Sequence, residues 1–443
     1  MIAIQEDLTT RQQLLQRLAD ARAQSDALFK YVRPAALYDR PIPERHRIIF
    51  YVGHVEAFDW NLLHTTVLGE RGFHPEFDRL FAFGIDPVGG GLPTDQPGDW
   101  PSIESVHDYV SSVRCILDEK LAHDTPEPAG EAKGFSLGTL LNVAIEHRLM
   151  HLETLAYMLH QLPFDKKIVQ PGSPCVATAP ATPQMVAIPA GMAKLGLSRD
   201  GSAFGWDNEF ESHQVPVPGF EIDQYMVTNR QYLDFIRAGG YDSRALWSDA
   251  DWNWKTKHGI AHPVFWKKTG DRWLYRTMFE EIPLPLDWPV YVSHAEASAY
   301  TRWAGKSLPT EAEWHRAAYG SPTGLERLYP WGNALPASHL GNFDFESWAP
   351  QPVNAFPASD SAFGVSGMLG NGWEWTSSVF SSFPGFQPFP FYRGYSADFF
   401  DGRHFVMKGG SARTAACMLR PTFRNWFQPH YQYVYAGFRC VNR

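Results

Sequence analysis

Residues 136–162 read SLGTLLNVAIEHRLMHLETLAYMLHQL. This leucine-rich run predicts one long helix that begins near Ser136 and ends near Leu162. Three more helices are predicted upstream from the spacing of apolar residues and from the N-cap residue Ser102, with loops between them. They are expected over 8–32, 46–68 and 102–123, and loops over 69–101 and 124–134. Four such helices form a bundle, so we expect an all-α domain over residues 1–162.

Two histidines, His147 and His151, stand at positions i and i+4 of the last predicted helix. This spacing places both imidazoles on one helix face, a turn apart, as two ligands of one metal ion need. His54, beside Gly53 in the second predicted helix, is the best candidate for a third ligand. Three neutral imidazoles suit Fe(II), Zn(II) or Cu(II) and leave coordination positions open. A histidine pair of this spacing also arises by chance, and we expect other histidines of this region at the surface or in loops: His64, His74, His107 and His160.

The composition excludes several classes of function. The formal net charge is −9 without any basic run, which argues against a nucleic-acid-binding surface. No apolar run approaches the roughly 20 residues that span a bilayer, and the first residues lack the apolar core of a secretory signal. We therefore expect a cytoplasmic protein without membrane contact. The 4 cysteines show no CxxC spacing, so neither a disulfide framework nor a zinc ribbon is expected.

The chain changes character after the bundle. Residues 163–184 are rich in proline, alanine and threonine without a period, which predicts a linker. From Met185 the segments are short and rich in glycine, proline and tryptophan, which is typical of an irregular α+β domain over 185–443. Helical runs in this part are expected over 228–238, 294–305 and 310–319.

Both halves resemble known families. The N-terminal half resembles DinB-like bundles, whose metal pattern is one early His and then HxxxH with a following Glu. His54, His147, His151 and Glu153 match that pattern, although Glu153 lies nearly opposite the pair and is not expected to be a ligand. The C-terminal half resembles the formylglycine-generating, sulfatase-modifying-factor fold, a C-type-lectin-like α+β domain. The matching motifs lie at 185–191, 204–209, 227–232, 308–314, 370–375, 408–411 and 436–440.

The two domains in this order resemble the hercynine sulfoxide synthases of ergothioneine biosynthesis, the ovothiol synthases and the selenoneine synthases. The resemblance covers nearly the whole chain. It implies a mononuclear non-haem Fe(II) enzyme that uses O2 and takes hercynine (N-alpha-trimethylhistidine) as one substrate. The second substrate is then a thiol, or a selenol donor such as a selenosugar, which is joined oxidatively to C2 of the imidazole. No obligatory protein partner is implied.

The substrate residues are expected in two aromatic stretches. Hercynine carries a quaternary ammonium, which aromatic faces bind with about 0.5–2 kcal/mol. In residues 423–427, Arg424 could bind a carboxylate, Asn425 could orient it and Trp426 could stack. The alternative is that Phe423 and Trp426 are core rings and Arg424 is a structural ion-pair partner. Residues 394–402 form a second aromatic and acidic loop, from which we take Asp398 as a further substrate-binding candidate.

The sequence departs from the sulfur enzymes at two places. Leu152 follows His151 where those enzymes often carry glutamine, and Phe81 and Phe83 stand where some carry a Tyr-Tyr pair thought to deliver protons or electrons. Phe81 and Phe83 are then expected to line the substrate pocket, and any tyrosine must come from elsewhere. The altered loop favours the selenoneine-synthase branch, with an ergothioneine-type sulfoxide synthase using cysteine or gamma-glutamylcysteine as the alternative. Of the available Tyr392, Tyr395, Tyr431, Tyr433 and Tyr435, we take Tyr395 as the catalytic candidate.

Three functions of other classes remain as alternatives. A formylglycine-generating oxidase needs a cysteine pair near the Gly-Gly-Ser stretch, but residues 409–414 hold none, Cys417 comes later, and Cys440 belongs to the terminal motif. A non-catalytic binding module would suit a lectin-like domain but would leave the three histidines unexplained. A zinc-dependent thiol transferase on the bundle is the third alternative.

Overall fold

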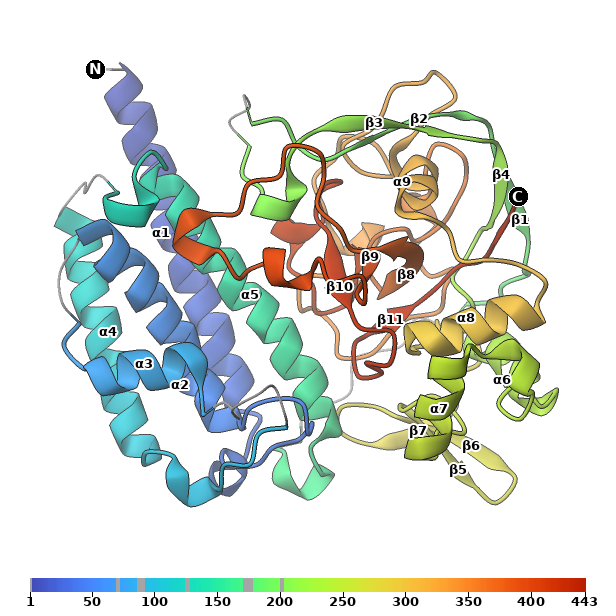
Figure 1. Cartoon of the computed structure of the whole chain (residues 1–443), viewed down its shortest axis with the longest axis horizontal. Coiled ribbons are helices and arrows are strands. Elements are labelled where there is room, and N and C mark those ends of the chain that lie inside the picture. The colour runs from blue at the N-terminus through green and yellow to red at the C-terminus, as the bar shows by residue number, and fades with distance from the viewer. Residues whose placement is uncertain (1, 69–71, 86–91, 124–127, 170–177, 200–202) are drawn as a thin grey trace. The chain divides into compact units, whose positions relative to one another are not determined.

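The computed structural model describes residues 2–68, 72–85, 92–123, 128–169, 178–199 and 203–443 (Figure 1). It divides the chain into two compact units. The first, called here the helical unit, comprises Met1–Gln170 together with Phe389–Tyr392. The second, called the mixed unit, comprises Pro171–Pro388 and Arg393–Arg443. The predicted linker, 163–184, falls partly outside the described residues.

The helical unit contains the four expected long helices. These are α1 (Ile2–Phe29), α2 (Ile48–Asp59), α4 (Ile103–His123) and α5 (Leu137–Gln161). Helix α2 continues as a π-helix over Trp60–Leu68. Because α1 packs along α5 while α2 contacts both α4 and α5, the apolar faces of these helices meet in one core. Among the described helices, none is both long enough and apolar enough to cross a membrane.

One further helix lies where a loop was predicted. Helix α3 (Pro75–Phe83) lies within the stretch 69–101, so that prediction was wrong there. The side chain of His74 caps the helix by accepting a hydrogen bond from the backbone N–H of Phe77. A helix this short depends on tertiary packing rather than on propensity. Phe77 and Phe81 provide that packing, since both rings are buried against the bundle.

The mixed unit is built from small sheets. A three-stranded antiparallel sheet has the order β1-β4-β12, and a four-stranded sheet has the order β10-β9-β8-β11 with β11 parallel to β8. Strands β2 and β3 form an antiparallel pair, and β5, β6 and β7 form a meander. Their bounds are β1 Met185–Ile188, β2 Gly191–Leu195, β3 His213–Val217, β4 Phe220–Asp223, β5 Trp266–Thr269, β6 Arg272–Arg276, β7 Glu281–Pro283, β8 Gly372–Val379, β9 Phe405–Gly410, β10 Asn425–Phe427, β11 Ala436–Gly437 and β12 Val441–Asn442.

Four α-helices accompany these sheets among the described residues. Three of them, α6 (Asn229–Arg237), α8 (His294–Trp303) and α9 (Glu311–Tyr319), lie where helices were expected. Each begins with a capping box, in which a Ser or Thr side chain and a Glu or Gln three residues later satisfy the first free N–H groups. The fourth, α7 (Asp249–His258), was not predicted. None of its side chains is fully buried, so its sequence lacks the regular spacing of apolar residues from which a helix is predicted.

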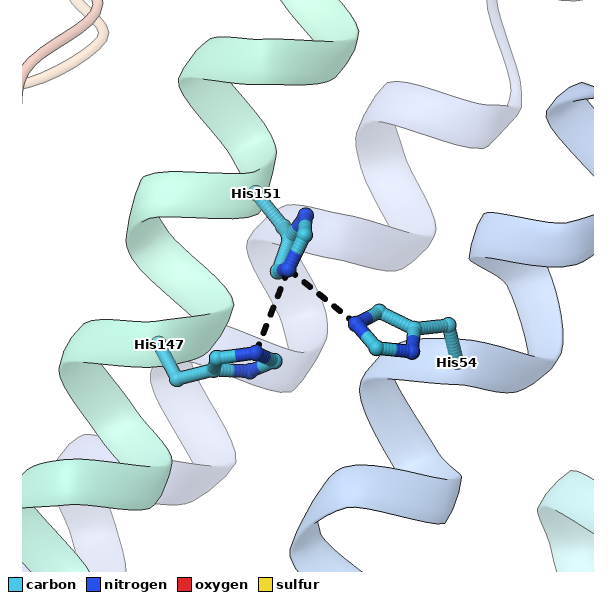
Figure 2. Close-up of side chains that lie close together, drawn as sticks. All are labelled: His54, His147 and His151. Atoms are coloured by element: carbon cyan, nitrogen blue, oxygen red, sulfur yellow. Dashed lines mark hydrogen bonds between the residues drawn. The ribbon is translucent and has the colours of Figure 1, made fainter. Parts of the chain in front are cut away.

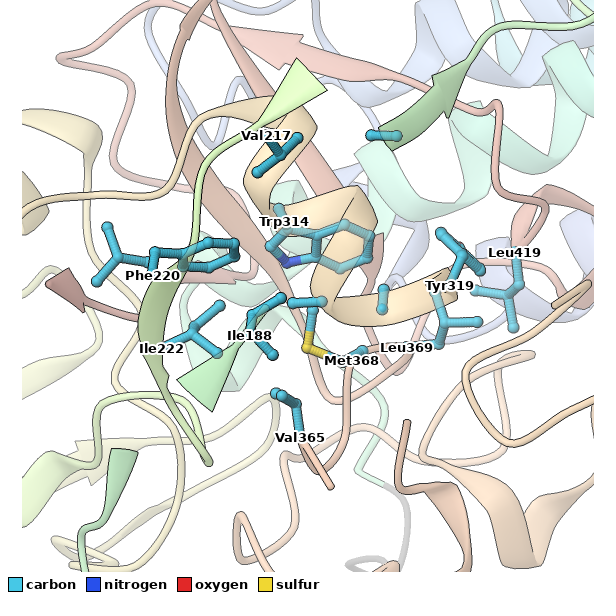
Figure 3. Close-up of a cluster of buried hydrophobic side chains, with 14 of the residues drawn as sticks. Ile188, Val217, Phe220, Ile222, Trp314, Tyr319, Val365, Met368, Leu369 and Leu419 are labelled. Atoms are coloured by element: carbon cyan, nitrogen blue, oxygen red, sulfur yellow. The ribbon is translucent and has the colours of Figure 1, made fainter. Parts of the chain in front are cut away.

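Two residues of the C-terminal family motifs, Ile188 and Trp314, belong to a cluster of buried hydrophobic side chains in the mixed unit (Figure 3). Trp314 lies at its centre with no exposed surface, and its ring N–H donates to the Glu374 carboxylate at 2.9 Å. Glu374 pairs in turn with Arg439, and each side chain is only 1% exposed. Trp373 and Trp375 are buried as well. These motif residues therefore contribute to the core of the mixed unit.

Candidate metal centre

Three imidazoles converge inside the helical unit (Figure 2). His54 comes from α2, and His147 and His151 come from adjacent turns of α5. The Nε2 atom of His151 lies 3.1 Å from Nε2 of His54 and 3.2 Å from Nε2 of His147. Nitrogen atoms that bind one ion at about 2.1 Å, with bond angles near 90–110°, lie about 3.0–3.4 Å apart. Two pairs of the predicted ligands thus lie at distances that suit one metal ion, and all three ligand atoms lie within 4.8 Å of one another.

The protonation of these rings also suits a metal. The Nδ1–H of His54 donates to the carbonyl oxygen of Phe81 at 2.6 Å, which leaves its Nε2 free to coordinate. Burial lowers the pKa of His54 to about 4. Burial, followed by the neighbouring imidazoles, lowers the pKa of both His147 and His151 well below the ordinary value. Within the part of the chain that the structure describes, the Nδ1 atoms of these two rings have no hydrogen-bond partner. Neutral rings with free Nε2 atoms are what a divalent transition metal binds.

Aromatic rings hold the ligands in place. Phe58 stacks on His147 with ring centroids 3.4 Å apart and planes 10° apart. Phe50 stacks on His54 at 4.6 Å. These contacts restrict the rotation of two ligand side chains and surround the site with low-polarity groups.

A tyrosine from the C-terminal half also belongs to this environment. Tyr392 is assigned to the helical unit, and its ring centroid lies 6.1 Å from that of His147 and 5.2 Å from that of Phe58. The predicted catalytic residue, Tyr395, lies in the mixed unit and stacks on Trp206 at 4.0 Å. Of these two tyrosines, Tyr392 is the one that belongs to the unit that holds the three histidines.

Gly53 is required beside His54 for a steric reason. A Cβ atom at this position would lie 2.4 Å from the Phe81 ring. We expect Gly53→Ala to lower the free energy of unfolding by about 1–3 kcal/mol, because Phe81 must move. The same movement displaces the Phe81 carbonyl from His54, so metal affinity should also fall. Denaturant unfolding and a metal titration measure the two effects.

Gly138 on α5 provides the control for this prediction. A Cβ atom there meets its nearest neighbour, Leu14, at 3.5 Å, which is an ordinary contact. Gly138→Ala should therefore change stability by less than about 1 kcal/mol and leave the metal affinity unchanged. Equal metal affinity in the two variants would contradict the role given to Gly53.

Arg424, one of the predicted substrate residues, already has a carboxylate partner. Its guanidinium donates to both oxygens of Glu311, at 2.9 and 3.1 Å, and the residue is 3% exposed. Phe380 and Phe383 cover it at 4.9 and 4.0 Å. Burial alone would raise the pKa of Glu311, but Arg424 and then Lys408 hold it below its ordinary value. This geometry favours the structural ion-pair alternative over substrate binding by Arg424.

We expect Arg424→Met to destabilise the mixed unit by about 3–5 kcal/mol, because it leaves the Glu311 carboxylate buried without its partner. Denaturant unfolding of the full chain measures this loss. Arg443→Met is the control: Arg443 pairs with Glu313, but its side chain is 44% exposed, so the cost should be about 0–1 kcal/mol. If Arg424 instead binds substrate, its variant will raise KM with unchanged stability.

The other predicted substrate residues are divided between the units. Phe81 and Phe83 lie on α3 of the helical unit, where Phe81 is fully buried and Phe83 is 69% exposed. In the mixed unit, Trp426 stacks on Phe380 at 4.2 Å. Its neighbour Asn425 uses its side-chain oxygen to accept from the Trp426 backbone N–H. Phe423 is a buried ring and Asp398 is exposed in the same unit. Phe81 contributes its carbonyl oxygen to the site, as partner of His54, rather than its ring.

The chain matches two protein families, one in each half. Residues 17–155 match the DinB superfamily, and residues 173–443 match the sulfatase-modifying factor enzyme 1-like domain. The predicted fold, a helical bundle followed by an α+β domain, is confirmed. Fold and site together define a class of protein in which a DinB-type bundle with a three-histidine cluster is joined to a sulfatase-modifying-factor domain.

Several relatives match both halves. The hercynine oxygenase of Mycolicibacterium smegmatis is 34% identical, and the alignment covers 98% of this chain and 99% of that protein. The hercynine oxygenase of Mycolicibacterium thermoresistibile is 38% identical over 75% of this chain and 73% of its own length. Ergothioneine biosynthesis protein 1 of Neurospora crassa is 29% identical over 91% of this chain and 55% of its own length. The chain belongs to the hercynine oxygenase family, which confirms the resemblance inferred from the motifs.

Proposed function

We propose that this protein is an O2-dependent, mononuclear non-haem iron enzyme that forms a bond between a chalcogen and imidazole C2 of hercynine. The observation that carries the proposal is the cluster of His54, His147 and His151. It lies in a chain that aligns over 98% of its length with the M. smegmatis hercynine oxygenase. A binding module without chemistry would leave three buried imidazoles that share one focus unexplained.

The chemistry balances with O2 as the oxidant. The donor loses its S–H or Se–H proton, the imidazole loses the proton on C2, and the new bond takes the place of both. Coupling removes two electrons and oxidation of the chalcogen removes two more. One oxygen atom of O2 stays on the chalcogen and the other leaves as water. Bound iron, held by the three histidines, would supply open positions for O2, the chalcogen and the substrate imidazole.

The protein's own side chains prepare this reaction. Burial keeps the imidazoles neutral, and the Phe81 carbonyl fixes the tautomer of His54. We assign proton delivery to the Tyr392 hydroxyl, which is supported by the position of its ring beside His147 and Phe58. Tyr395 is kept as the second candidate. A positioned proton donor typically accelerates a reaction about 10²–10⁴-fold.

The proposed donor is a selenol source such as a selenosugar. This proposal is supported by two positions where the sulfur enzymes often carry polar side chains. Here these positions hold Leu152, which is 1% exposed, and Phe81, which is fully buried. Neither side chain can form hydrogen bonds, so the pocket differs from that of the sulfur enzymes. The alternative is an ergothioneine-type reaction with cysteine or gamma-glutamylcysteine. The names of the relatives, which refer to hercynine and to ergothioneine biosynthesis, favour that alternative.

One reconstitution experiment tests the proposal. The protein is loaded with Fe(II) without oxygen and mixed with hercynine and, separately, with cysteine, gamma-glutamylcysteine or a selenosugar. O2 is then admitted and the products are weighed by mass spectrometry. A coupled product from the selenosugar alone supports the selenium branch, and one from a thiol alone supports the sulfur branch. No product from any donor, or equal product from Zn(II)-loaded protein, overturns the iron-dependent coupling.

A further inference from the structure

One buried arginine joins the two helices that carry the ligands. Arg148 directly follows His147 on α5 and has no exposed surface. Its guanidinium donates to three acceptors on α2: the Val55 carbonyl at 2.9 Å, Glu56 at 2.8 Å and Asp59 at 2.6 Å. Val55 in turn directly follows His54. The two ligand helices are therefore cross-linked one residue beyond a ligand on each of them.

The charges around this arginine are compensated inside the bundle. Glu56 and Asp59 are both fully buried, and Glu56 also pairs with Arg114 of α4 at 2.6 Å. Arg22 of α1 lies 3.8 Å from Glu56 and 3.9 Å from Asp59. The free energy needed to remove such charges from water offsets much of their mutual attraction. Apolar side chains of similar size in the same place are often as stabilising. The stability of the bundle alone therefore gives no reason for charges at this depth.

A planar guanidinium with three acceptors fixes both the separation and the register of the two helices. Its donors are arranged as a rigid fork, so a shift of α2 along α5 breaks more than one of the bonds at once. The imidazoles of His54 and His147, each one residue away from these bonds, are therefore held in the same register. An error of an ångström between the helices would move the Nε2 atom of His54 away from its present 3.1 Å distance to His151.

We propose that Arg148 is a positioning residue of the metal centre, whose bonds to Val55, Glu56 and Asp59 set the helix spacing at which the three imidazoles share one ion. The inference rests on the metal site proposed above and is independent of the substrate. In this proposal the network around Arg148 serves to organise the metal site rather than to stabilise the bundle.

Metal titration of the apo full-length chain tests the proposal. Co(II) is the probe, since its visible spectrum reports the number and geometry of its ligands. Two variants remove the cross-link: Arg148→Met, and the triple variant Arg148→Met/Glu56→Gln/Asp59→Asn. The triple variant leaves neither carboxylate buried without Arg148, while Arg22 keeps Asp118 and Arg114 keeps Asp26 as partners. Both should weaken Co(II) binding by about 10–100-fold and change its spectrum, as loss of groups that orient ligands does elsewhere.

Arg114→Met is the matched control. It removes the same charge and breaks a bond to the same Glu56, but it leaves the α2–α5 cross-link intact. Its Co(II) affinity should stay within about threefold of wild type, well short of the loss expected for ligand-orienting groups, with an unchanged spectrum. Thermal unfolding of all variants separates stability from affinity.

The outcomes are distinct. The proposal is overturned if the triple variant binds Co(II) with wild-type affinity and spectrum, or if Arg114→Met weakens binding as much as Arg148→Met. Should Arg148→Met and the triple variant both fail to fold, Co(II) binding by Arg148→Lys tests the proposal instead. Lysine keeps the charge but cannot reach three acceptors in a plane, so wild-type binding by it would also overturn the proposal. Failure of the wild-type protein to bind Co(II) would instead remove the metal site itself.

Discussion

His54→Ala, His147→Ala and His151→Ala should each abolish iron retention and turnover. Each substitution removes one of three nitrogen atoms that share a single focus in the helical unit. Loss of groups that merely orient ligands costs about 10–100-fold in metal affinity, so loss of a ligand should cost more than about 100-fold. Iron content after anaerobic loading and desalting measures the affinity, and single-turnover product formation measures the chemistry.

His107→Ala provides the control for these variants. His107 is an exposed histidine on α4, outside the three-histidine cluster. It should retain iron and turnover at wild-type levels. The mixed unit should unfold in all four variants at the same denaturant concentration, because none of the substitutions lies in it. Full activity in any of the ligand variants would remove that residue from the site.

Tyr392→Phe should lower turnover by about 10²–10⁴-fold while leaving iron affinity unchanged. The substitution removes the hydroxyl group alone and keeps the ring that packs beside Phe58 and His147. Rapid mixing of the iron- and substrate-loaded protein with O2 measures the rate of the coupling step. Iron content should match wild type, which separates this effect from ligand loss.

Tyr395→Phe is the matched comparison, three residues further along the chain. Its ring stacks on Trp206 in the mixed unit, so loss of its hydroxyl should change turnover by far less than in Tyr392→Phe. The reverse order of effects would return the catalytic role to Tyr395, as first predicted from the sequence. Equal and small effects in both would show that neither tyrosine delivers the proton.

The histidine cluster could be predicted because its signal is local and periodic. His147 and His151 share a helix face by their spacing alone, and His54 stands out as a polar residue within an apolar helix. The fold of the C-terminal half followed from motifs that the structure places in the core, such as Trp314 and Glu374. Both signals can be read from the sequence because few other residues meet the same requirements, either for a ligand on one helix face or for a partner in the core.

Tertiary context decided what the sequence could not show. Helix α3 is short and lies in a stretch rich in glycine, proline and aspartate, which predicted a loop. Helix α7 buries none of its side chains fully, so its sequence shows no clear apolar period. For α7 a signal was present: Ser248 at the start and Gly259, with φ of 64°, at the end mark a capped helix. No helix was predicted there because the polar composition of the segment was given more weight than these two capping residues.

Side-chain partners were the least predictable feature. Arg148 stands between two ligands in the sequence, but only the packing of α2 against α5 reveals its three acceptors. Likewise, nothing local distinguishes Tyr392 from Tyr395, and the choice between them depends on which unit each joins. Arg424 was expected to meet a ligand, whereas a distant residue, Glu311, occupies its guanidinium.

Anomalous diffraction at the iron absorption edge, from crystals of the anaerobically Fe(II)-loaded protein, measures the position of the metal directly. We expect a single peak in the helical unit, about 2.1 Å from the Nε2 atoms of His54, His147 and His151. A peak bound by other side chains, or protein that takes up iron with these three imidazoles left uncoordinated, would contradict the account.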